Sequence, residues 1–133
     1  MRSGRCLCGA VAYELTAEPQ MLALCHCRDC QYITGGEPMA VAVAPPGSFR
    51  LTRGELRTYM AQADSGNMVD RNFCPTCGTQ VVNRLQAGPF VAVTVGTLDE
   101  PLALQPQMEI WTVSAQPWAH HPDGAARFDK NPG

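Results

Sequence analysis

Residues 74–78 read Cys-Pro-Thr-Cys-Gly, a turn that offers two closely spaced thiols. Pro75 fixes φ between the two thiols, so the turn brings both sulfurs to one side. Gly78 permits the positive φ that directs backbone N–H groups at the sulfurs, and those hydrogen bonds favour thiolate over thiol. Such a turn is one half of a tetrahedral zinc site, whose other ligands come from a second segment.

A second pair of cysteines, Cys6 and Cys8, precedes Gly9 near the start of the chain. A closed four-sulfur shell results when this pair joins Cys74 and Cys77, and we expect a structural zinc site of this composition. Two alternatives stay open at this point. The sulfurs are either unligated buried thiols, or the later pair is a redox-active Cys-x-x-Cys.

Three further cysteines lie close together in the chain, namely Cys25, Cys27 and Cys30. Three thiolates can hold a zinc ion and leave its fourth position open, which is typical of catalytic sites. An open position suits a thiol substrate, because zinc deprotonates a coordinating thiol. We therefore expect a labile second zinc here. The alternatives are a fourth protein ligand elsewhere in the chain, or a cluster that holds no metal.

The chain has three histidines. His26 lies between two candidate ligands, so its side chain is expected to form a hydrogen bond or pack rather than bind metal, with ligation as the alternative. His120 and His121 fall in a proline-rich tail and are expected to be exposed. The alternative is that one of them completes the shell of the second zinc.

Composition limits the class of protein. The chain has 133 residues, 45% hydrophobic and 17% charged, which suits one domain over residues 1–133 and excludes general disorder. A formal net charge of -2 provides no basic surface for nucleic acid. No apolar run approaches the roughly 20 residues that span a bilayer, and residues 1–9 lack a secretory apolar core. We expect a cytoplasmic protein, whose seven cysteines indicate metal binding or catalysis rather than disulfides.

Glycine and proline cut the chain into short segments, most of which have the composition of strands. One short helix is expected over residues 27–34, ending at Gly35, and an irregular tail begins at about residue 117. Many short strands and little helix predict a mainly β fold. The expected strands are residues 10–16, 40–44, 79–85, 90–95 and 108–113, together with a hairpin over 51–59 that turns at Arg53-Gly54.

The three cysteine motifs, in this order, resemble those of the glutathione-dependent formaldehyde-activating enzyme family, which has an Mss4-like fold. The likeness covers nearly the whole chain. The matching residues are 4–13, 25–30, 35–36, 71–79, 96–101, 110–111, 117–118 and Phe128.

The resemblance implies a small β-rich fold of stacked antiparallel sheets around zinc. The family's activity joins glutathione to formaldehyde, giving S-(hydroxymethyl)glutathione, as a carbon–sulfur lyase acting in the synthetic direction. A small-molecule thiol and an aldehyde are then the partners, and neither nucleic acid nor a membrane is expected. The resemblance also implies a structural zinc on Cys6, Cys8, Cys74 and Cys77, and a labile one on Cys25, Cys27 and Cys30.

We expect the three-cysteine site to receive the thiol of glutathione, as the catalytic part of the protein. Arg28 and Arg71 are expected either to offset the charge of the thiolates or to bind the carboxylates of glutathione, since guanidinium binds carboxylate bidentately. Two positions depart from the family. Asn72 stands where members usually carry Gly or Ser, and Glu109 stands where they usually carry His.

Other functions fit the same residues. The chain could be a zinc-stabilised structural or binding module, or a glutathione carrier without turnover. It could also be an enzyme for a different thiol or carbonyl, or a redox protein that uses the three clustered cysteines. Trp111, Trp118 and Phe128 are expected to pack in the core, with a substrate wall as the alternative.

Overall fold

The computed structural model describes residues 1–85 and 88–132 of the chain. The strands are β1 (Arg2–Arg5), β2 (Ala12–Leu15), β3 (Met21–Cys25), β4 (Met39–Ala44), β5 (Phe49–Arg53), β6 (Arg57–Gln62), β7 (Met68–Phe73), β8 (Gln80–Leu85), β9 (Val91–Thr94), β10 (Met108–Ile110) and β11 (Ala126–Arg127). The helices are α1 (Arg28–Thr34) and the 3₁₀ turns η1 (Val95–Thr97) and η2 (Thr112–Ser114).

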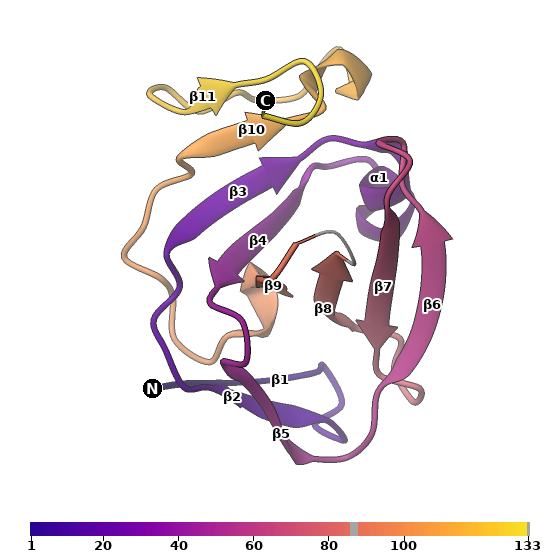
Figure 1. The fold of residues 1–133 in the computed structure, drawn as a ribbon, viewed down its shortest axis with the longest axis vertical. Coiled ribbons are helices and arrows are strands. Elements are labelled where there is room, and N and C mark those ends of the chain that lie inside the picture. The colour runs from indigo at the N-terminus through magenta and orange to yellow at the C-terminus, as the bar shows by residue number, and fades with distance from the viewer. Residues whose placement is uncertain (86–87, 133) are drawn as a thin grey trace.

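The strands form two sheets. A three-stranded antiparallel sheet has the order β1-β2-β5, and a larger sheet has the order β11-β10-β3-β4-β9-β8-β7-β6. Figure 1 shows the larger sheet curving from β11 at the top to β6 at the right, with the small sheet below it. The larger sheet is antiparallel except at one edge, where β10 runs parallel to both β3 and β11.

The prediction of a mainly β fold with little helix is confirmed, and five predicted strands match β2, β4, β8, β9 and β10. The predicted helix is α1, whose C-terminal Gly35 adopts the left-handed conformation with φ of 91°. The strand expected over 108–113 ends early, because Trp111 takes a positive φ of 58° and the chain enters η2.

The hairpin predicted over 51–59 is wrong. Strand β5 pairs with β2 in the small sheet, whereas β6 pairs with β7 in the large one. The turn at Gly54 therefore crosses between sheets instead of closing a hairpin. A Cβ atom on Gly54 would lie 2.1 Å from the carbonyl oxygen of Ala10, so the chain approaches the segment after Cys8 more closely than any side chain permits.

Two hydrophobic cores cover opposite faces of the large sheet. Strand β4 is buried along most of its length because its alternate residues serve both cores. Ala42 and Ala44 face the core that packs under the small sheet, and Val41 and Val43 face the core on the other side. Each core includes cysteines. Cys6 and Cys74 belong to the first, and Cys27 and Cys30 belong to the second.

The close approach at Gly54 generates a test. We expect Gly54→Ala to lower the free energy of unfolding by about 1–3 kcal/mol more than Gly66→Ala, as overpacking does. Both glycines have positive φ, 79° and 89°, so the conformational cost of a side chain is matched, but nothing lies within 4 Å of a Cβ on Gly66. Urea denaturation measures the difference, and equal effects would contradict the contact.

Candidate metal centres

Four cysteine sulfurs meet where the two sheets join. Cys6 and Cys8 follow β1, and Cys74 and Cys77 follow β7. Their four Sγ atoms lie within 4.8 Å of one another, with Cys8 Sγ 3.7 Å from Cys6 Sγ and 3.8 Å from Cys74 Sγ. A tetrahedron of sulfurs around zinc at 2.3 Å has edges of about 3.8 Å. The four residues therefore fit a zinc ion in both donor type and spacing.

Backbone N–H groups point at these sulfurs, as the turn sequence predicts. Cys6 Sγ accepts from the Val11 N–H at 3.3 Å, and Cys74 Sγ accepts from the N–H groups of Thr76 at 3.4 Å and Cys77 at 3.5 Å. Gly78 has a φ of 78°, which completes this turn in the conformation expected of glycine there. The backbone therefore stabilises negative charge on the sulfurs.

The thiols of this cluster also differ in acidity. Hydrogen bonding to Thr79 lowers the pKa of Cys77 to about 5. The Ala10 N–H lowers the pKa of Cys8, but desolvation and the three neighbouring sulfurs outweigh it and raise that pKa to about 11. The crowded sulfurs cannot all ionise by themselves, so a cation is needed to hold four thiolates together.

The remaining cysteines gather at the start of α1. Cys25 ends β3, Cys27 is the N-cap of α1 and Cys30 lies in its first turn, and their Sγ atoms lie within 4.8 Å of one another. Cys27 Sγ accepts the Cys30 N–H at 3.4 Å, as an N-cap side chain does. Cys27 and Cys30 are buried and Cys25 is half-buried, so the cluster is reached from the Cys25 side.

Acidity is again unequal among these three thiols. Hydrogen bonds from Cys25 and Cys30 lower the pKa of Cys27 well below its usual range, against the effect of burial. Hydrogen bonding to Cys27 raises the pKa of Cys25. One thiolate among the three is thus favoured, and holding all three as thiolates requires a cation. The donor set fits a metal ion with three sulfur ligands.

The two arginines singled out from the sequence occupy different places. Arg71 on β7 is buried, and its guanidinium nitrogens lie 3.9 and 4.0 Å from Cys30 Sγ. The two terminal nitrogens therefore face the sulfur cluster, whereas Nε has no hydrogen-bond partner within residues 1–85 and 88–132. Arg28 is exposed on α1, where it donates to Gln31 at 2.9 Å and lies over the Tyr32 ring.

Glu109 forms the centre of a polar cluster that the sequence did not predict. Its side chain is fully buried on β10, and its Oε1 lies 2.9 Å from His26 Nε2 and 2.7 Å from His121 Nδ1. Burial raises the pKa of Glu109, but the two histidine hydrogen bonds outweigh it and hold that pKa below its usual value. The hydrogen bond expected of His26 is present. His121 is half-buried against Glu109, not exposed as predicted.

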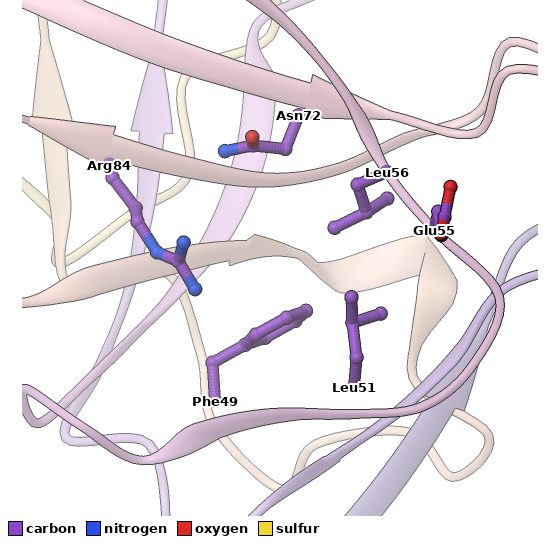
Figure 2. Close-up of a pocket in the computed structure, with 6 residues that line it drawn as sticks. All are labelled: Phe49, Leu51, Glu55, Leu56, Asn72 and Arg84. Carbon is purple, nitrogen blue, oxygen red and sulfur yellow. The ribbon is translucent and has the colours of Figure 1, made fainter.

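A shallow hollow of about 420 Å³ is lined by Asn72 of β7 together with Phe49 and Arg84 (Figure 2). Neighbouring residues of a strand point to opposite faces, so this hollow lies on the other face of β7 from Arg71. Arg84 reaches over the Phe49 ring on its wall, with 5.4 Å between the guanidinium carbon and the ring centre. Asn72 also lines it, but its amide is engaged, since it donates to the Val82 carbonyl at 3.2 Å and accepts the Thr58 hydroxyl at 2.6 Å. The hollow contains no cysteine, and Asn72 has a structural role.

The three aromatic residues near the C-terminus do not behave alike. Trp111 packs in the core beside Cys27 and Cys30, as predicted. Phe128 is half-buried. The prediction of core packing is wrong for Trp118, which is 61% exposed and lies over Gly36 at the end of α1.

A mainly β fold with one cluster of four cysteines and one of three defines a protein that can hold metal ions. The sequence matches the glutathione-dependent formaldehyde-activating enzyme family over residues 1–114, and the chain belongs to that family. The structure is similar to the crystal structure of a Rhodobacter sphaeroides protein, with a TM-score of 0.59 and 25% identity over 78% of this chain and 91% of that one. No curated protein matches the sequence.

The helices in the described part of the chain are not suited to crossing a membrane, as none combines the required length with an apolar sequence.

The four-cysteine cluster, called the sulfur quartet below, allows a test of which sulfurs stabilise the fold. We expect Cys74→Ala to prevent folding, because structural zinc contributes an apparent 10–16 kcal/mol, about as much as the roughly 5–15 kcal/mol net stability of a domain. We expect Cys27→Ala to fold. Thr76→Ala, in the same turn as Cys74 but exposed, is the matched control and keeps native zinc content. Circular dichroism and metal analysis provide the readout, and a native, soluble Cys74→Ala would contradict the assignment.

Proposed function

We propose that the protein condenses glutathione, or a similar thiol, with formaldehyde to S-(hydroxymethyl)glutathione, as a zinc-dependent enzyme of the carbon–sulfur lyase type. Family membership supports glutathione-dependent formaldehyde activation. The observation that carries the finer proposal is the three-sulfur cluster at the start of α1, with one buried guanidinium against it. In this proposal Cys25, Cys27 and Cys30 hold the working zinc.

The proposal assigns a second, structural zinc to the other four cysteines. Their spacing supports a closed tetrahedral shell, in which every ligand position is filled by the protein. A closed shell offers no position to a substrate. The two clusters therefore have different roles, since only the three-sulfur cluster has fewer sulfurs than zinc has ligand positions.

The reaction adds a thiol across a carbonyl group. A C–S bond forms between the thiol sulfur and the formaldehyde carbon, the C=O π electrons move to oxygen, and the thiol proton ends on that oxygen. Nothing leaves, and nothing is oxidised or reduced. Zinc bound to the three sulfurs would supply Lewis acidity that favours the thiolate form of an added thiol. The protein's task is therefore to stabilise a thiolate and to position it.

The residues around the cluster fit that task. The buried guanidinium of Arg71, 3.9 Å from Cys30 Sγ, offsets the negative charge that thiolates accumulate. Cys25 is the half-buried member of the cluster, so substrate approaches from its side. Arg28 is exposed in the first turn of α1, and a guanidinium binds a carboxylate bidentately, which supports a role for it in binding glutathione. We therefore assign charge balance to Arg71 and glutathione binding to Arg28.

One observation favours a second candidate function. Cys27 and Cys30 are only 5% and 4% exposed, which suits a site that stabilises structure. A zinc-stabilised binding module, or a carrier that holds glutathione without turnover, is compatible with that burial. Turnover distinguishes these functions from the enzyme.

Exchange spectroscopy by NMR tests turnover directly. The spontaneous reaction also proceeds, so the measurement compares the rate of exchange between free and glutathione-bound formaldehyde with and without the zinc-loaded protein. We expect the wild type to raise the rate in proportion to its concentration, and Cys27→Ala to lose this effect while staying folded. An equal rate with wild type and Cys27→Ala would remove the enzyme proposal in favour of the carrier or module.

The assignment of Arg28 has its own test. We expect Arg28→Ala to raise KM for glutathione about 10-fold, equivalent to about 1.4 kcal/mol, because a charge-assisted hydrogen bond is lost. The same variant should leave the kinetics with 2-mercaptoethanol unchanged, since that thiol has no carboxylate. Steady-state kinetics with both thiols decides, and a parallel change for both would show that Arg28 does not bind glutathione.

A further inference from the structure

His26, Glu109 and His121 form a third cluster of potential metal ligands, and it contains no sulfur. Its members come from three separate segments. Glu109 lies on β10, which runs parallel to β3 on one side and to β11 on the other. His26 directly follows β3. After β10, the chain passes through η2 and turns back, so that His121 lies beside the same carboxylate.

The three side chains converge on one point. Both His26 Nε2 and His121 Nδ1 lie against the same oxygen of Glu109, Oε1, at 2.9 and 2.7 Å. The two imidazole rings are tilted by 39°, with 5.3 Å between their centres. His26 and Glu109 are 1% and 0% exposed, whereas the His121 side chain is 29% exposed. An ion therefore reaches this cluster past His121.

The second oxygen of Glu109 shows that this carboxylate has unused binding capacity. Oε2 is buried and has no hydrogen-bond partner within residues 1–85 and 88–132. Arg127 Nε lies 3.3 Å away, but without hydrogen-bond geometry, and its side chain is 53% exposed. A buried carboxylate oxygen without a partner is costly, and a half-exposed arginine can turn outward. An ion held between the three groups would bring Oε2 into use.

The donors suit a borderline divalent ion. Two imidazole nitrogens and one carboxylate are the protein ligands of several catalytic zinc sites, which leave a further position to solvent. One carboxylate and two neutral imidazoles give a net charge of -1, so the three groups with a bound Zn²⁺ carry +1, and Arg127 turns away from Glu109 when the ion binds. We propose that His26, Glu109 and His121 bind a zinc ion, separately from the cysteine clusters, and thereby fix the C-terminal segment to β10. This goes beyond the proposed function and does not depend on it.

The position of the imidazole protons distinguishes zinc from simple hydrogen bonding. Without metal, His26 donates from Nε2 and His121 donates from Nδ1 to Glu109. A nitrogen that binds zinc has no proton, so each neutral imidazole moves its proton to the other ring nitrogen. Long-range ¹H–¹⁵N correlation spectra of ¹⁵N-histidine-labelled, full-length protein report this directly, with zinc in excess and after treatment with a chelator.

With excess zinc, we expect His26 protonated at Nδ1 and His121 protonated at Nε2, with both reverting as the chelator removes this ion. In parallel, we expect His121→Ala to bind one zinc per chain fewer than His120→Ala, its exposed neighbour in the same segment, by metal analysis after dialysis. Glu109→Gln should lose the same single ion. Unchanged protons in excess zinc, or equal zinc content in His121→Ala and His120→Ala, would overturn the proposal and leave a hydrogen-bonded trio.

Discussion

The structure depends on holding four sulfur atoms at one point where its two sheets meet. Cys6 and Cys8 come from the end of the small sheet, and Cys74 and Cys77 come from the end of β7 in the large one. Thiols packed 3.7–3.8 Å apart resist simultaneous ionisation, so holding all four sulfurs as thiolates requires positive charge at the junction. The backbone N–H groups at Val11, Thr76 and Cys77 provide part of that charge. This requirement joins segments that are distant in sequence and fixes how the sheets cross.

The two faces of the large sheet divide the chemistry. One core contains the sulfur quartet's Cys6 and Cys74, and the other contains Cys27 and Cys30. Strand β4 is shared between them. Successive side chains of a β-strand point to opposite faces of the sheet, so neighbours on β7 also differ in their surroundings. Arg71 faces Cys30, whereas Asn72 faces the hollow beside Phe49. A change confined to one face can therefore alter the three-sulfur site without disturbing the junction between the sheets.

Local patterns in the sequence predict what depends on near neighbours. The turn at Cys74–Cys77 with its glycine, the helix after Cys27 and most strands follow from spacing and turn residues. The hairpin at Gly54 fails because β5 pairs with β2 and β6 pairs with β7, and local sequence does not encode that choice of partners. The trio around Glu109 was missed because His26 and His121 lie 83 and 12 residues away. The available signals were an acidic residue inside an apolar strand and the departure of Glu109 from the His usual in the family.

The position of Cys27 at the start of α1 links sulfur chemistry to backbone order. A capping side chain normally offers oxygen, whereas here sulfur accepts the Cys30 N–H. The strength of that cap grows with the negative charge on the sulfur, so alkylation or oxidation of this one atom would loosen the first turn of the helix. Trp118 lies against Gly36 at the other end of α1. Because α1 is short, loosening of its first turn would change the surroundings of this indole and therefore its fluorescence.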